Sequence, residues 1–196
     1  MKTVEVNVYQ FDELSDEAKE KAREWYRNGS FNYEWWDFLY DDFKERAKEV
    51  GFDVTNIYFR GFWSQGDGAM FEYDYMRDKL RLEFINQLGL SAMRKDWLIN
   101  NTMTSGRGKH RGHYYHSRCC EHNIYWEVDN GDLHYWLESF ESDFIDFVTD
   151  KYEDLCHELY KSLEKEYEYL NSDEVIDESL IVNEYEFDED GNRFEY

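Results

Sequence analysis

Apolar residues alternate with polar ones at the start of the chain, and this pattern predicts a strand over residues 3–10. The spacing then changes to the three- and four-residue period of an amphipathic helix over residues 15–29. Ser15 can cap the start of this helix, and Gly29 can end it. A second stripe of the same period predicts another helix over residues 33–50. We expect the two helices to form a helical hairpin joined by a short loop.

The middle of the chain is rich in β-branched and aromatic residues, which predict strands over residues 52–62 and 69–76. Strict alternation in the second of these strands places its aromatic side chains on one face. The segment SQGDG, residues 64–68, lies between them and indicates the connection of a β-hairpin. Its turn is expected to use positive φ values over residues 66–68.

The pattern after this hairpin predicts a helix over residues 78–88 and two further strands over residues 97–104 and 113–128. A basic loop, SGRGKHRG, is expected to separate the two strands. The second of them would send His113, Tyr115 and Ser117 to one face and their neighbours to the other.

Apolar residues then recur every three or four positions over residues 133–170, which predicts one long amphipathic helix. At 1.5 Å per residue this helix would be roughly 55 Å long. It could bend, break near Thr149, or reach a partner and so support a homo-oligomer. The tail, residues 171–196, is expected to be an acidic hairpin around the turn DEDGN.

The expected fold class is α+β, with a mainly antiparallel sheet, an N-terminal helical hairpin and a long C-terminal amphipathic helix. One domain over residues 1–196 is the simplest division. Its predicted parts are an αβ core over residues 1–132, the long helix over residues 133–170 and the hairpin over residues 171–196.

Composition adds two constraints on the compartment. No apolar run is long enough to span a membrane or to act as a signal peptide, so we expect a cytoplasmic protein without membrane contact. The 3 cysteines include two neighbours, Cys119 and Cys120, and do not suggest a disulfide framework.

The net charge of −23 changes the picture of possible partners. Direct binding to nucleic acid is disfavoured, because non-specific binding to a phosphate backbone depends on clustered cations. The charge could serve solubility alone, or it could attract a basic partner such as a nucleic-acid-binding protein.

Two segments are candidates for a small-ligand site, SQGDG and the locally basic RGHYYHS at residues 111–117. Aromatic, Arg and His side chains together can stack on and pair with a nucleotide or phosphate. Each segment could equally be structural: a plain hairpin turn, and a basic loop that offsets nearby carboxylates. The candidate ligand-binding residues are Gln65, Asp67, Arg111, His113, Tyr114, His116 and Arg118.

No metal site or cofactor is expected. The paired C-x-x-C of a zinc site is absent, and DEDGN lacks the spacing of a calcium loop. No catalytic residue is assigned, because G-x-S-x-G is absent, although Asp67 with His113 or His116 could act as acid and base if the two segments meet in space. Whether the chain is an enzyme is therefore left open.

Three segments occur in order along the chain: FDELSDEAKEKAREWYR, FRGFWSQGDGAMFEYDY and HRGHYYHS. In these segments, within residues 4–128, the chain resembles a group of small proteins encoded by bacteriophages and prophages. The resemblance implies a phage origin and expression in the host bacterial cytoplasm. It implies no activity and assigns no role to any residue.

Charge and suspected origin together favour a phage-encoded acidic inhibitor of a bacterial defence system, of the anti-CRISPR or anti-restriction kind. It would bind a host nucleic-acid-binding protein complex through an acidic surface that mimics DNA. The expected partner-binding residues are Glu166, Glu168, Asp173, Glu174, Asp177, Glu178, Glu184, Glu186, Asp188, Glu189 and Asp190. The alternative is a small-ligand protein, either a nucleotide hydrolase or a sponge for a nucleotide signal, built from SQGDG and RGHYYHS. A third reading is an assembly protein that oligomerises through the long helix.

Overall fold

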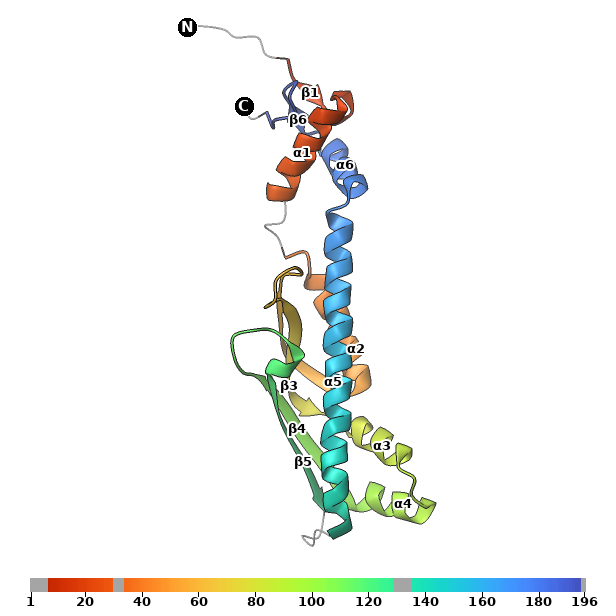
Figure 1. Ribbon diagram of the computed structural model, residues 1–196. Helices are drawn as coiled ribbons and strands as arrows, with labels where there is room; N and C mark the ends of the chain where they lie inside the picture. The colour runs from red at the N-terminus through yellow and green to blue at the C-terminus, as the bar shows by residue number, and fades with distance from the viewer. Residues whose placement is uncertain (1–6, 30–33, 129–134, 195–196) are drawn as a thin grey trace. The chain divides into compact units, whose positions relative to one another are not determined.

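The computed structural model describes residues 7–29, 34–128 and 135–194, with the backbone alone for residues 135–139 (Figure 1). It confirms the predicted fold class of helices with an antiparallel sheet. The chain divides into two compact units. The terminal unit comprises Met1–Asp37 and Glu164–Tyr196, and the central unit comprises Phe38–Leu163. These units cut across the three predicted parts, which followed secondary structure.

The terminal unit is built around α1 (Asp16–Gly29) and α6 (Asp173–Val182). A short 3-10 helix, η1 (Phe11–Glu13), precedes α1, and β1 (Tyr9–Gln10) pairs antiparallel with β6 (Glu186–Phe187). Of the strand predicted over residues 3–10, only β1 is formed among the described residues, and positions 1–6 lie outside them. The buried core of the unit contains Phe11, Leu14, Ala18, Ala22, Ile176, Leu180 and Phe187.

The predicted start of α1 is confirmed, because the amide of Ala18 donates to Ser15 Oγ at 3.3 Å. The strand predicted over residues 179–187 of the tail is wrong in its extent, since residues 179–182 form the last turn of α6 and only β6 at residues 186–187 is a strand. Ile176 and Leu180 are four residues apart and fully buried, so burial on one helical face outweighs the β propensity of this segment.

The turn at DEDGN is confirmed. Asp188 Oδ1 accepts hydrogen bonds from the amides of Asp190 (3.0 Å) and Asn192 (2.9 Å), which closes the loop on itself. Gly191 adopts a φ of +81°, and an added Cβ would lie 2.1 Å from the carbonyl oxygen of Ala18. Only glycine fits there, so the turn packs directly against α1.

The central unit contains one four-stranded antiparallel sheet in the order β2-β3-β4-β5. Its strands are β2 (Phe52–Arg60), β3 (Gly68–Met76), β4 (Thr102–His110) and β5 (Cys120–Val128). β2 with β3 and β4 with β5 form long ladders, but β3 and β4 are in register only at Tyr73 and Gly108. The sheet therefore consists of two hairpins that lie side by side and share only a short stretch of paired backbone.

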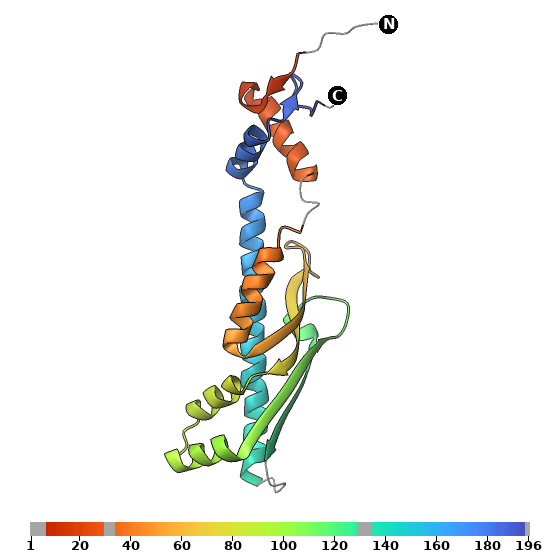
Figure 2. The same ribbon diagram turned by 180° about the vertical axis from the view of Figure 1, so that it is seen from behind.

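Helices of the central unit include α2 (Asp37–Val50), α3 (Asp78–Gln87), α4 (Ala92–Asn101) and α5 (Tyr135–Leu170), of which α5 passes into the terminal unit at its last turns. α2 and α5 lie along one side of the sheet in both views (Figures 1 and 2). Both helices predicted over residues 15–29 and 33–50 are present, as α1 and α2. α1 packs on α6 in the terminal unit, whereas α2 belongs to the central unit.

The helix α5 does not break at Thr149. The Thr149 hydroxyl donates to the carbonyl oxygen of Ile145 at 2.8 Å, so this polar side chain is satisfied within the helix. Its apolar stripe supplies Phe144, Val148, Tyr152 and further buried residues. One uninterrupted helix therefore covers the sheet of the central unit.

The strands predicted over residues 97–104 and 113–128 are wrong in their bounds. Residues 97–101 complete α4, whose end is held by Arg81, a buried guanidinium that donates to Leu98 O and Thr102 Oγ1 at 3.1 Å each. Residues 105–110, predicted as a basic loop, belong instead to β4. The strand β5 begins only at Cys120, so the alternation proposed for His113 to Ser117 does not apply.

The glycines of the basic segment explain why it can be a strand. A Cβ at Gly108 would lie 2.3 Å from Cε1 of Tyr73, so β4 approaches β3 through a position that has no side chain. Sequence propensity disfavours glycine in strands, but close packing against a neighbouring ring requires it here.

The predicted alternation of β3 holds up to Tyr73 and then fails. Tyr73 is fully buried, whereas Tyr75 is 57% exposed and Met76 is buried. The register with β2 skips Asp74, since Val54 faces Tyr73 and Asp53 faces Tyr75. This β-bulge inserts one residue and exchanges the two faces of the strand beyond it.

Glu72 is a buried carboxylate that joins three strands. It is 8% exposed and accepts hydrogen bonds from Asn56 Nδ2 at 2.7 Å and from the amide of His110 at 2.9 Å, and Lys109 Nζ lies 3.6 Å away. Burial disfavours the charged form, but these hydrogen bonds and the Lys109 charge outweigh it and lower the pKa of Glu72.

We predict that Glu72→Gln lowers the free energy of unfolding at pH 7 by about 1–3 kcal/mol, because charge-assisted hydrogen bonds are lost in a buried site. The folded-state pKa lies below the unfolded one, so this contribution is present above the unfolded-state pKa and is lost as the pH falls through the folded-state value. Urea unfolding of both proteins from pH 7 to pH 3 measures the difference. It should shrink with falling pH, with exposed Glu127→Gln as the control; a constant difference would contradict the assignment.

Candidate functional site

The segment SQGDG connects β2 to β3, as predicted, but Asp67 rather than positive φ values shapes the turn. The carboxylate of Asp67 accepts from the amides of Trp63 at 3.0 Å and Ser64 at 2.6 Å. The positive φ of this region belongs to Gly61, at +49°, and not to residues 66–68. The Asp67 carboxylate therefore stabilises the loop by binding its backbone amides. A carboxylate used in this way does not support a role for Asp67 as a general base.

The glycines of SQGDG serve a different purpose from the one predicted. An added Cβ at Gly66 would lie 2.7 Å from Cε1 of Tyr114, and one at Gly68 would lie 2.8 Å from the carbonyl oxygen of Tyr115. The same position at Gly68 is 2.9 Å from Nδ1 of His116. The two candidate segments thus meet in space, and the absence of side chains at these glycines permits the contact.

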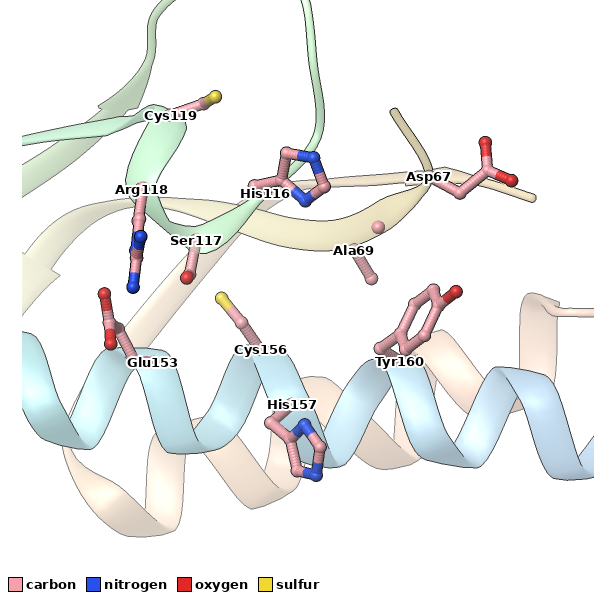
Figure 3. Close-up of a pocket in the computed structure, with 11 residues that line it drawn as sticks. Asp67, Ala69, His116, Ser117, Arg118, Cys119, Glu153, Cys156, His157 and Tyr160 are labelled. Carbon is pink, nitrogen blue, oxygen red and sulfur yellow. The ribbon is translucent and has the colours of Figure 1, made fainter. Parts of the chain in front are cut away.

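A pocket of about 480 Å³ lies beside this contact, entirely within the central unit. The strand β4 ends at His110, so the short helix η2 (Ser117–Cys119) lies next to the start of β3 in place of a paired strand on that edge. α5 forms the opposite wall (Figure 3). The lining residues are Asp67, Gly68, Ala69, His116, Ser117, Arg118, Cys119, Glu153, Cys156, His157 and Tyr160.

Side chains from the two walls point toward one another. Figure 3 shows Ser117 directed toward Cys156, and Arg118 directed toward Glu153 of α5. The Asp67 carboxylate points away from α5, and His157 is turned to the far side of the helix. The central part of the pocket is therefore formed by η2 and by the upper face of α5.

Four of these polar side chains, those of His116, Ser117, Arg118 and Glu153, make no hydrogen bond or ion pair with any part of the chain that the structure describes. Two other basic side chains of this region are paired: Lys109 with Asp74 at 2.8 Å, and Arg111 with Glu121. Unused donors and acceptors that converge on one cavity are the usual feature of a site that binds a polar ligand.

The thiols of the region are poor nucleophiles. Burial raises the pKa of Cys120 to about 11 and that of Cys156 to about 12, so both are protonated at neutral pH. Cys119 lines the pocket, but its thiol points away from α5 (Figure 3). Ser117 and His116, both in the part of the chain that the structure describes, are not joined by a nucleophile–base hydrogen bond. The arrangement suits binding better than covalent catalysis.

The structure gathers three of the seven predicted ligand residues, Asp67, His116 and Arg118, at this pocket. Gln65, Arg111, His113 and Tyr114 do not line it, and all four are exposed. Tyr114 contributes indirectly, since its ring packs on the backbone at Gly66 and near His116.

The sequence analysis missed the contribution of α5. Glu153, Cys156, His157 and Tyr160 follow the spacing of one helical face, which is the signal that marks them as neighbours. This spacing does not reveal which loop the face meets, because the loop is distant in the sequence.

The predicted acidic surface lies in the terminal unit. Asp177 is bound by Arg23 at 2.6 Å, Asp173 pairs with Arg27, and Asp188 holds its own turn, so these three carboxylates are engaged within the fold. Glu166, Glu186 and Asp188 are half-buried. The exposed residues of the predicted acidic surface are Glu168, Asp173, Glu174, Glu178, Glu184, Glu189 and Asp190.

No group of three or more His, Cys, Asp or Glu side chains in the described residues has a geometry that could hold a metal ion. Over the same part of the chain, no helix combines the length and the apolar character needed to cross a membrane.

We predict that Gly68→Ala destabilises the protein by about 1–3 kcal/mol, because the new methyl group would collide with the backbone at Tyr115. Gly89→Ala is the matched control, since nothing lies within 4 Å of its added Cβ. Thermal unfolding of both variants measures the effect. Equal stability of the two would show that the two loops do not pack as closely as described.

Comparison with known proteins places the whole of this pocket inside one family. The model of the family described as a domain of unknown function, DUF8835, matches residues 35–173, which include every residue that lines the pocket. No curated protein and no solved structure matches the chain. With most of its length matched by the family model, the chain belongs to the DUF8835 family.

Proposed function

We propose that the protein binds a small anionic ligand in the pocket between η2 and α5. The observation that carries this proposal is the convergence of His116, Ser117 and Arg118 on one cavity without hydrogen bonds to the described chain. These side chains offer one guanidinium charge, an imidazole and a hydroxyl donor. Such a set binds a phosphate or carboxylate group.

The charge of the whole protein gives this local cluster its significance. At a net charge of −23, an anion is repelled by most of the surface. A ligand that nevertheless binds must gain its affinity from specific contacts within the pocket. The proposal is therefore one of selective binding, with sequestration of the ligand favoured over hydrolysis because no nucleophile is activated and Asp67 is already engaged.

Arg118→Ala is expected to weaken binding of ribose 5-phosphate about 10-fold or more, which corresponds to the loss of one charge-assisted hydrogen bond. Arg107→Ala is the matched control, because Arg107 is exposed on β4 and does not line the pocket. Isothermal titration calorimetry measures both, and circular dichroism verifies that both variants fold. Equal affinity for the two variants, or no binding by the unaltered protein, would refute an anion site at η2.

We propose a second function, favoured by the net charge of −23: a phage-encoded acidic inhibitor of a bacterial defence system, acting in the host cytoplasm. The exposed carboxylates of the terminal unit, among them Glu174, Glu178 and Glu184, would take the place of DNA phosphates on a host nucleic-acid-binding complex. Engagement of Asp173, Asp177 and Asp188 within the fold reduces the acidic surface below what the sequence suggested.

Neutralising Glu174, Glu178 and Glu184 to Gln is expected to abolish capture of a host protein from a bacterial lysate, and added salt should abolish it for the unaltered protein. A control variant removes the same charge from exposed positions of the central unit, with Asp96→Asn, Glu127→Gln and Asp154→Asn. Quantitative mass spectrometry of the captured material distinguishes them. Equal losses in both variants would mean that net charge, and not this surface, governs association.

A further inference from the structure

The pocket has chemically different ends. Figure 3 shows Arg118 and Glu153 facing each other at one end, and Tyr160 at the other, with His116 and Cys156 between them. Glu153 and Tyr160 are seven residues apart on α5, which corresponds to about 10 Å along the helix axis. A ligand that touches both ends must be about as long as a nucleoside monophosphate.

The Tyr160 end provides an aromatic surface. The ring of Tyr160 lines the pocket and lies 5.6 Å from that of Phe62, at an interplanar angle of 50°, so Phe62 packs against it. Phe62 in turn contacts Trp63, which is 76% exposed at the tip of the loop. A supported ring beside a cavity is a suitable platform for stacking of a planar ligand group.

The Arg118 end of the pocket carries one positive side chain, Arg118, and one negative side chain, Glu153. The guanidinium of Arg118 can pair with a phosphate, and His116 can add a hydrogen bond to it. Glu153 cannot accept a phosphate, but its carboxylate can accept hydrogen bonds from vicinal hydroxyl groups, the chemistry by which carboxylates hold a ribose. The acidic neighbour also limits the charge that this end tolerates, which favours one phosphate over a polyphosphate.

We propose that the ligand of this pocket is a nucleoside monophosphate, with its phosphate on Arg118 and His116, its ribose on Glu153 and its base stacked on Tyr160. This assignment rests on the anion site proposed above and adds a requirement for an aromatic base. It distinguishes a nucleotide from a sugar phosphate, which would use only the Arg118 end.

The test compares three probes by isothermal titration calorimetry: adenosine 5′-monophosphate, ribose 5-phosphate and adenosine triphosphate. The unaltered protein is expected to bind the monophosphate about 10-fold or more tightly than ribose 5-phosphate, because stacking of one base contributes that much. Tyr160→Leu should remove this preference while leaving the affinity for ribose 5-phosphate unchanged. Tyr160→Phe, which keeps the ring, should retain it.

The outcomes separate this inference from the proposed function. If ribose 5-phosphate binds as tightly as the monophosphate, or if Tyr160→Leu weakens both probes equally, the nucleotide assignment is overturned while the anion site stands. If neither phosphate binds, or if Arg118→Ala changes neither affinity, both proposals are overturned. Adenosine triphosphate binding more tightly than the monophosphate would also contradict the role given to Glu153.

Discussion

The carbonyl oxygen of Phe71 accepts a hydrogen bond at 2.7 Å from the hydroxyl of Tyr152, and the central unit is organised around this contact. Residues 68–73 of β3 are buried, so polar backbone groups on this strand need partners. β4 pairs with this stretch only at Tyr73, which faces Gly108. The hydroxyl of Tyr152 on α5 supplies a further donor to this strand.

Because the paired backbone of β3 and β4 is short, side chains make most of the other connections between β3 and its neighbours. On one side, Glu72 bridges the gap by accepting the amide of His110 at 2.9 Å. Deeper in the core, the hydroxyl of Tyr73 and Nδ1 of His122 lie 2.9 Å apart, which connects β3 to β5. Next to Gly68, past the last residue of β4, η2 and α5 enclose the pocket. The pocket is thus a consequence of where β4 ends beside β3.

The charged side chains of the two units differ in whether they form ion pairs. Asp177 and Asp173 of α6 form ion pairs with Arg23 and Arg27 of α1. These ion pairs hold α6 against α1 in the terminal unit. In the central unit, Lys109 and Arg111 are paired with Asp74 and Glu121. Arg118 differs from them, because it faces a cavity and makes no ion pair within the described chain. This difference, rather than the number of basic residues, distinguishes the candidate site from its surroundings.

The sequence by itself determined the elements whose signals are local. The three- and four-residue periods predicted α1, α2, α3 and α5, and the turn residues predicted the β2–β3 connection and the loop at Asp188. These features depend on side chains within a few positions of one another, so their patterns are complete in the sequence.

Other features were decided only by the tertiary structure. The basic segment became β4 because Gly108 lets it approach Tyr73, and Tyr75 turned outward because a bulge at Asp74 shifted the strand. The pocket-lining residues on α5 could not be predicted for the same reason. Their role depends on which loop the helix meets, and that contact follows from the pairing of strands that are far apart in the chain. Long-range packing of this kind leaves no periodic signal in one sequence. The contact between SQGDG and RGHYYHS, and the pocket between η2 and α5, therefore could not be predicted from it.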